Sequence, residues 1–300
     1  MTVPRTDLAL EARELFEESV GETTALQGVQ AQEYGRRGCA VTAVDILNGQ
    51  GSHALGKPVG RYLTVTLEQE NLSGKGFEDA ARCIAEELRR LLPPLDGEKP
   101  VLVAGLGNRE VTPDAIGPLT ADHILVTRHM VAAVPETFGE FRPVSATVPG
   151  VLGTTGVESA ETVRALAERI GAAAVIAVDA LAARDTGRLC STLQISNTGI
   201  SPGSGIGNRR NALDQKTIGC PVIALGVPTV TDAATMASDL FQRAGMEVEE
   251  EQLRKVSTGM IVTSGDIDRR VREIARVLAY AINGALHEDL TLEELTDLTF

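Results

Sequence analysis

Apolar runs that alternate with amphipathic helical segments occupy most of the chain beyond residue 100. The runs at 101–107, 173–181 and 220–230 are continuous, which is typical of strands buried on both faces. Residues 158–172 and 267–286 instead place their apolar residues at helical spacing. Strands that alternate with helices predict an α/β fold with a mostly parallel sheet and helices on both faces.

The first hundred residues follow a looser pattern. Residues 8–18 and 77–92 predict amphipathic helices, and residues 61–68 alternate apolar and polar side chains as a half-exposed strand does. No low-complexity linker separates this part from the rest. We therefore expect an N-terminal elaboration over about 8–98, built onto a core over about 99–290.

Composition and charge narrow the function classes. The 300 residues include 28 Lys and Arg against 41 Asp and Glu, and the net charge of −13 argues against direct nucleic-acid binding. The four cysteines show no CxxC pair, so neither a disulfide framework nor a zinc site is expected. No apolar run reaches the roughly 18 residues of a membrane span, and the first residues contain no signal-peptide core. We expect a soluble intracellular protein that does not enter membranes.

Two aspartates and one glycine-rich loop follow predicted strands. Asp114 comes shortly after the run at 101–107, and Asp179 lies near the end of the run at 173–181. The loop TGISPGSGIGNRR, 198–210, follows a further predicted strand. Because the carboxyl ends of parallel strands meet at one edge of a sheet, we expect the two carboxylates and the loop to lie together.

Asp114 has two simpler interpretations. The turn GLGN before it lacks the third glycine of a dinucleotide fingerprint and the lysine of a P-loop, so a nucleotide-binding module remains only an alternative. In TPDA, Thr112 can cap a helix, Pro113 fits its first turn, and a carboxylate there favours the helix dipole by about 0.3–1 kcal/mol. Asp179 has no such explanation, because a charge beside an apolar strand is costly unless it is paired or used.

Two carboxyl groups at one edge can share a proton, so that one acts as a base on water and the other as an acid. This chemistry hydrolyses a bond without a metal or a nucleophilic serine. We expect no nucleophile elbow, because the one GxSxG match, GISPG at 199–203, falls within the glycine-rich loop, and the four histidines (His53, His123, His129 and His287) show no metal-binding spacing. We expect these histidines to lie on the surface or to pack.

Long motifs occur in order along the chain. Among them are GRYLTV (60–65), GLGNREVTPDAIGP (105–118), VIAVDALAAR (175–184) and QISNTGISPGSGIGNRR (194–210). Together they resemble the spore germination proteases, endopeptidases that degrade small acid-soluble spore proteins. The resemblance implies an atypical aspartic endopeptidase with a hydrogenase-maturation-protease-like core, made as a zymogen in the developing spore and assembled as a homotetramer.

The resemblance also assigns site residues. The family's two catalytic aspartates match Asp114 and Asp179, and no cofactor is implied. The family trims its own N-terminus within an RTD-LA motif, which places the cut here between Asp7 and Leu8. The implied units are a propeptide, 1–7, and a single α/β peptidase domain, 8–300, in the cytoplasm of the forespore and later the spore core.

The glycine-rich loop and nearby arginines are candidates for substrate binding. Backbone amides of the loop can bind the developing oxyanion or the substrate backbone. The loop residues concerned are Gly203, Ser204, Gly205, Gly207 and Asn208. Three arginines can attract an acidic residue beside the cut, as the family's substrates are cleaved beside glutamate. They are Arg184, Arg209 and Arg210.

Related families suggest two alternative activities. Hydrogenase-maturation endopeptidases recognise a metal in their substrate through a Glu, an Asp and a His, which correspond to Asp114, Asp179 and Gly203; the third ligand is missing here, which disfavours metal dependence. Peptidyl-tRNA hydrolases share GLGN and TRH, but the acidic charge opposes tRNA. Two departures from germination proteases are Ser201, where HPGSG is common, and a shorter segment at 235–258.

Overall fold

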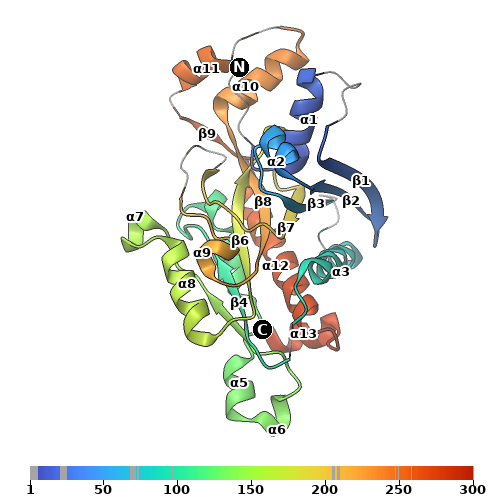
Figure 1. The fold of residues 1–300 in the computed structure, drawn as a ribbon, viewed down its shortest axis with the longest axis vertical. Helices are drawn as coiled ribbons and strands as arrows, with labels where there is room; N and C mark the ends of the chain where they lie inside the picture. The colour runs from blue at the N-terminus through green and yellow to red at the C-terminus, as the bar shows by residue number, and fades with distance from the viewer. Residues whose placement is uncertain are drawn as a thin grey trace.

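The computed structural model contains a nine-stranded mixed sheet with helices on both faces (Figure 1). The structure describes residues 6–20, 26–67, 72, 74–95, 97–204, 207, 210–246, 248, 250–257 and 259–299. Strands and helices alternate through most of the chain, so the predicted α/β class is confirmed.

Four neighbouring strands form the parallel half of the sheet. Their order is β5–β4–β6–β8, and the register is parallel at each of the three pairings. The strands are β4 (Val101–Gly105), β5 (Val144–Thr147), β6 (Ala174–Ala182) and β8 (Val222–Asp232). Residues of β4 and β6 are almost all buried, as the continuous apolar runs predicted.

The other half of the sheet is antiparallel and extends from β8. Its order is β1–β2–β3–β7, and β7 pairs antiparallel with β8. The strands are β1 (Val29–Arg36), β2 (Cys39–Ile46), β3 (Gly60–Thr66), β7 (Thr192–Ser196) and the short β9 (Ile261–Val262), which pairs with β8. A two-residue turn with positive φ at Arg37 and Gly38 joins β1 to β2, and this conformation suits the twist of a hairpin.

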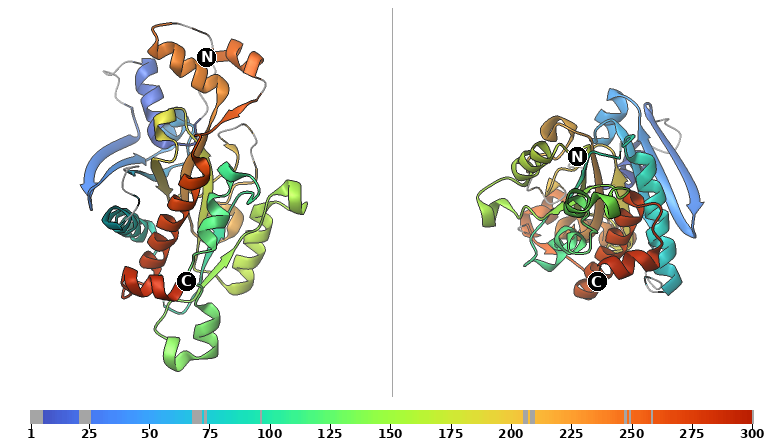
Figure 2. Two further views of the ribbon diagram at one scale, coloured as in Figure 1. Left: turned by 180° about the vertical axis from the view of Figure 1, so that it is seen from behind. Right: turned by 90° about the horizontal axis from the view of Figure 1, so that it is seen from below.

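Helices cover both faces of the parallel half (Figure 2). On one face, α3 (Gly74–Leu91) and α12 (Ile267–Leu286) pack against each other and against side chains of β4 and β6. On the other face, α8 (Ser159–Ile170) packs against the side chains of β4 and β6 that point the opposite way. The remaining helices are α1 (Ala9–Val20), α2 (Gly49–Leu55), α4 (Ile116–Ala121), α5 (Arg128–Ala133), α6 (Pro135–Phe138), α7 (Leu152–Thr155), α9 (Gln215–Ile218), α10 (Ala233–Arg243), α11 (Glu250–Ser257) and α13 (Leu292–Thr299).

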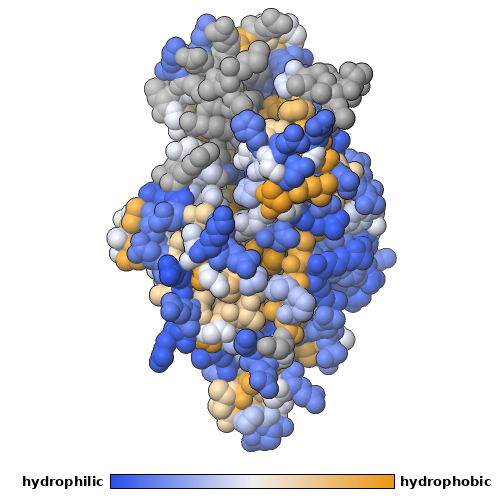
Figure 3. Space-filling model, in the orientation of Figure 1, coloured by the Kyte–Doolittle hydropathy of each residue, from blue (hydrophilic) through white to orange (hydrophobic). Residues whose placement is uncertain are grey.

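Figure 3 shows one face of the molecular surface. In the face shown in Figure 3, hydrophilic residues cover most of the area and hydrophobic residues form separate smaller regions. Within the described ranges, no helix has both the length and the apolar character needed to cross a membrane.

Close backbone packing fixes the turn that follows β4. At Gly117, in α4, an added Cβ would lie 2.2 Å from the carbonyl oxygen of Leu106 and 2.5 Å from that of Val178. At Gly105 it would lie 2.2 Å from the carbonyl oxygen of Gly117. Only glycine therefore lets α4 approach the ends of β4 and β6 this closely.

We expect Gly117→Ala to destabilise the fold, because the methyl group would displace backbone atoms of two strands. Overpacking of this kind costs about 1–3 kcal/mol or more, although alanine is otherwise the better helix former. Gly153→Ala in α7 is the matched control, since nothing lies within 4 Å of its added Cβ. Urea unfolding measures both, and equal midpoints for the two variants would contradict this account of the turn.

Candidate active site

The two predicted carboxylates lie at the same edge of the sheet. Asp179 lies within β6, and Asp114 ends a short 3-10 helix, η2 (Thr112–Asp114), which follows β4. Strands β4 and β6 are parallel neighbours, with Gly105 paired to Val178, so their carboxyl ends are adjacent. The arrangement expected at the strand ends is the one observed.

Asp179 is a buried carboxyl group. Its side chain is only 3% exposed within an almost wholly buried strand. Burial raises the pKa of Asp179 well above its usual range, and the nearby charges of Asp114 and Asp7 raise it further, while a hydrogen bond from the Ala180 amide opposes them. The group therefore holds its proton far more strongly than an ordinary aspartate.

Asp114 is held by the turn that precedes it. Its Oδ2 accepts a hydrogen bond of 2.7 Å from the backbone amide of Asn108, in GLGN. Burial raises the pKa of Asp114, and the Asn108 amide partly offsets this by favouring the charged form. An added Cβ at Gly107, where φ is 109°, would lie 2.0 Å from the carbonyl oxygen of Asp114. The expected cap at Thr112 is wrong, because Thr112 is itself the first residue of η2, and Val111 before it provides no side-chain cap.

The N-terminal segment lies against the end of β6. Asp7 donates its backbone amide to the Ala182 carbonyl at 2.9 Å, and its Oδ2 accepts the Ala182 amide at 2.9 Å. The hydroxyl of Ser204 donates to Oδ1 of Asp7 at 2.5 Å. Both the backbone and the carboxylate of Asp7 are therefore fixed next to Asp179.

The residues after Asp7 continue into a closed pocket. Leu8 is fully buried in a cluster with Leu181, Ala183 and Leu189. The backbone amide of Ala9, which follows Leu8, donates to Oε1 of Gln194 at 2.7 Å. The peptide bond between Asp7 and Leu8 is thus held on both sides at the edge that carries the two aspartates.

Glu11 is also buried, at 1% exposure, three residues beyond Leu8. Its carboxylate accepts the backbone amides of Arg184 at 2.7 Å and Asp185 at 3.0 Å, and Arg188 Nη1 lies 3.4 Å away. Burial raises the pKa of Glu11, although these donors oppose the shift. Sequence reasoning missed Arg188, because nothing in its local pattern shows that it faces the N-terminal segment.

The side chain of Arg184, one of the predicted substrate-binding arginines, donates to Glu18 of α1 at 3.0 Å. The amide of Arg210, another of them, donates to the Pro202 carbonyl at 3.1 Å. Arg209, Gly205 and Asn208 lie outside the described residues.

The described part of the glycine-rich loop contacts Asp7 through a side chain. The amide of Ser204 donates to the Ser201 carbonyl at 3.2 Å, and that of Gly207 donates to the Ser204 carbonyl at 3.2 Å. Gly203 and Gly207 both have positive φ, which the tight turn requires. These two amides are therefore used within the loop, whereas the Ser204 hydroxyl reaches the N-terminal segment.

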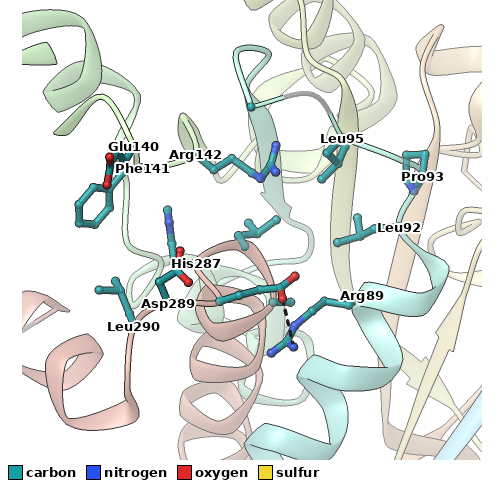
Figure 4. Close-up of a pocket in the computed structure, with 14 residues that line it drawn as sticks. Arg89, Leu92, Pro93, Leu95, Glu140, Phe141, Arg142, His287, Asp289 and Leu290 are labelled. Carbon is teal, nitrogen blue, oxygen red and sulfur yellow. Dashed lines mark ion pairs between the residues drawn. The ribbon is translucent and has the colours of Figure 1, made fainter.

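A cavity of about 540 Å³ (Figure 4) is lined by residues at and after the end of α3, just before β5 and at and after the end of α12, and Asp114 and Asp179 are not among them. Beside this cavity, Nη1 of Arg89 lies 3.7 Å from Oε2 of Glu288, and the ring centroids of His287 and Phe141 are 5.7 Å apart. Burial lowers the pKa of His287 to about 4, so the imidazole is neutral and packs.

Among the described residues, no group of three or more His, Cys, Asp or Glu side chains is arranged to hold a metal ion.

Comparison with known proteins identifies relatives along the whole chain. A family model described as Germination protease matches residues 9–252. The germination protease of Caldanaerobacter subterraneus is 41% identical over 98% of this chain and 97% of its own length. Those of Clostridium tetani and Bacillus cytotoxicus are 38% and 36% identical, over 97% and 95% of this chain and 98% and 94% of their own lengths. A solved NiFe hydrogenase maturation protease from Thermococcus kodakarensis shares 15% identity with a TM-score of 0.35, over 65% of this chain and 98% of its own.

The family match includes both aspartates, the glycine-rich loop and Arg188. The relatives align over nearly their full lengths, so the similarity is not confined to one motif. This chain belongs to the germination protease family, and it is a peptidase.

Proposed function

We propose that this peptidase is an endopeptidase of small acid-soluble spore proteins and that Asp114 and Asp179 activate the water that it uses. The observation that supports the pair most directly is the buried Asp179 carboxyl, whose pKa is raised by burial and by the charge of Asp114. The names of the relatives support a role in spore germination. The homotetramer and the location in the spore core remain predictions.

The two carboxyl groups have different surroundings and hence different roles. Asp179 is the more buried and carries the shared proton, whereas Asp114 accepts an amide and is the ionised member. Asp114 takes a proton from water as the water oxygen attacks the scissile carbonyl carbon. Asp179 then gives its proton to the leaving nitrogen as the carbon–nitrogen bond breaks. One water is consumed, and the pair regains its starting state when the proton on Asp114 passes to Asp179.

The same site supports the proposed self-cleavage between Asp7 and Leu8. Asp7 is bonded to Ala182 and Ser204 beside Asp179, and Leu8 fills an apolar pocket. A segment held in this way occupies the place of a substrate and blocks it. The chain is then a zymogen until the bond is cut and the new ends move away.

We expect Asp179→Asn and Asp114→Asn each to lower cleavage of an α/β-type small acid-soluble spore protein by about 100- to 10,000-fold, because each removes an acid or base. Mass spectrometry of the substrate and of the enzyme N-terminus measures both reactions. Asp268→Asn is the matched control, since Asp268 is exposed at the start of α12. Cleavage by either active-site variant at the control rate would refute the pair.

We also expect Asp179→Asn to be more stable than the wild type at pH 7. An unfolded aspartate has a pKa near 3.9, and that of Asp179 is raised in the fold, so above about pH 4 the native state binds more protons than the unfolded state. The unfolding free energy of the wild type then falls as pH rises through this window, and the asparagine variant lacks this loss. At pH 3 the variant should have lost its higher free energy of unfolding relative to the wild type.

Thermal unfolding of both proteins from pH 3 to 8 measures this difference. Asp268→Asn should be no more stable than the wild type at any pH, because Asp268 is exposed and a carboxylate in the first turn of α12 favours the helix. A stability difference between Asp179→Asn and the wild type that does not grow with pH would contradict the raised pKa.

A further inference from the structure

The carbonyl oxygen of Asp7 accepts hydrogen bonds from two side chains. Nζ of Lys57 lies 2.8 Å from this oxygen, and Nε2 of Gln194 lies 3.3 Å from it. Lys57 is half-buried in the connection between α2 and β3, and it also reaches the Thr6 carbonyl at 3.3 Å. This oxygen belongs to the peptide bond that the proposed self-cleavage breaks.

The sheet aligns Gln194 with Asp179. Gln194 of β7 pairs with Gly226 of β8, and Gly226 pairs with Asp179 of β6. Residues in register on neighbouring strands point to the same face, and strands lie roughly 4.8 Å apart, so the Cα atoms of Gln194 and Asp179 are about 10 Å apart. Gly226 lies between Gln194 and Asp179 and has no side chain. The side chain of Leu181, which also packs against Leu8, fills the space where a Gly226 side chain would lie.

Gln194 holds the chain on both sides of Leu8. Its Nε2 donates to the carbonyl before Leu8, and its Oε1 accepts the amide of Ala9 after it. Gln194 is 8% exposed, so these two bonds satisfy a buried amide group. The carbonyl of Asp7 is therefore turned toward Lys57 and Gln194, while the Asp7 carboxylate bonds Ser204 and Ala182.

We propose that Lys57 and Gln194 form the oxyanion hole of this peptidase. This inference rests on the proposed cleavage between Asp7 and Leu8. When water attacks the carbonyl carbon, the oxygen gains a full negative charge, and an ammonium group binds that charge more strongly than it binds a neutral carbonyl. The two donors hold the oxyanion until the carbon–nitrogen bond breaks and the carbonyl re-forms. A spore protein that takes the place of residues 7 and 8 meets the same donors.

Lys57→Met tests this role in the full-length chain. We expect self-cleavage, followed by intact mass, to slow by about 100- to 1,000-fold, as for the loss of one oxyanion donor elsewhere. Lys57→Arg keeps a cationic donor and should retain much more of the rate than Lys57→Met. Lys75→Met, on the exposed start of α3, is the matched control and should cleave like the wild type.

A second readout separates catalysis from simple anchoring. The assays on another protein use chains that begin at Leu8, because an uncut N-terminal segment would fill the site. With an α/β-type small acid-soluble spore protein as substrate, Lys57→Met should lower kcat and leave KM within about threefold. In the inactive Asp179→Asn form of this shortened chain, adding Lys57→Met should leave the Kd for that substrate within the same threefold. An equal loss in binding and in rate would overturn the proposal, because it would show that Lys57 only anchors the chain.

The outcomes also distinguish this inference from the proposed function. If Lys57→Met cleaves like the wild type while Asp179→Asn is inactive, the oxyanion hole is wrong and the aspartate pair stands. If Asp179→Asn itself retains cleavage, the aspartate pair fails. Gln194→Glu keeps the acceptor for Ala9 but removes the donor, so it decides the question by the same assays if Lys57→Met does not fold.

Discussion

Burial of the Asp179 carboxyl determines which charges and hydrogen bonds the other residues at this edge of the sheet can have. An ionised carboxylate costs several kcal/mol to bury without a partner, and Asp179 is 3% exposed in an apolar strand beside two further aspartates. The fold raises the pKa of Asp179, which favours its protonated form, while Asp114 and Asp7 receive hydrogen bonds from Asn108, Ala182 and Ser204. A stable proton beside an ionised carboxylate is what acid–base hydrolysis requires.

We propose that the N-terminal segment connects inhibition with catalysis. Asp7, bonded to Ser204, and Leu8, buried in its apolar cluster, occupy the space that another substrate would need. Glu11 also attaches the N-terminal segment to the turn that contains Arg188, through an ion pair with that residue. The same set of contacts can therefore keep the chain inactive towards other proteins and present one of its own bonds for cleavage.

Much of this arrangement follows from local sequence patterns. The apolar run of β6 places Asp179 in the last part of the strand, which continues to Ala182, and the helix expected at 267–286 matches α12 residue for residue. Long-range contacts carry no such pattern: Gln194 lies 187 residues from Asp7, and neither Lys57 nor Arg188 occurs in a motif that indicates its partner. The expected Thr112 cap was wrong because the helix begins one residue earlier than the pattern indicates, so that Thr112 is its first residue and Val111 precedes it.

The central claim is that Asp114 and Asp179 interact as a pair that shares one proton. Carbon-13 NMR of aspartate carboxyl groups across pH 3 to 9 tests it directly, with Asp179→Asn identifying the resonance. Asp179 should titrate well above 3.8 in the wild type and at a lower pH, still above 3.8, in Asp114→Asn, where burial remains and the neighbouring charge is gone. A midpoint near 3.8 in the wild type, or one unchanged by Asp114→Asn, would contradict it.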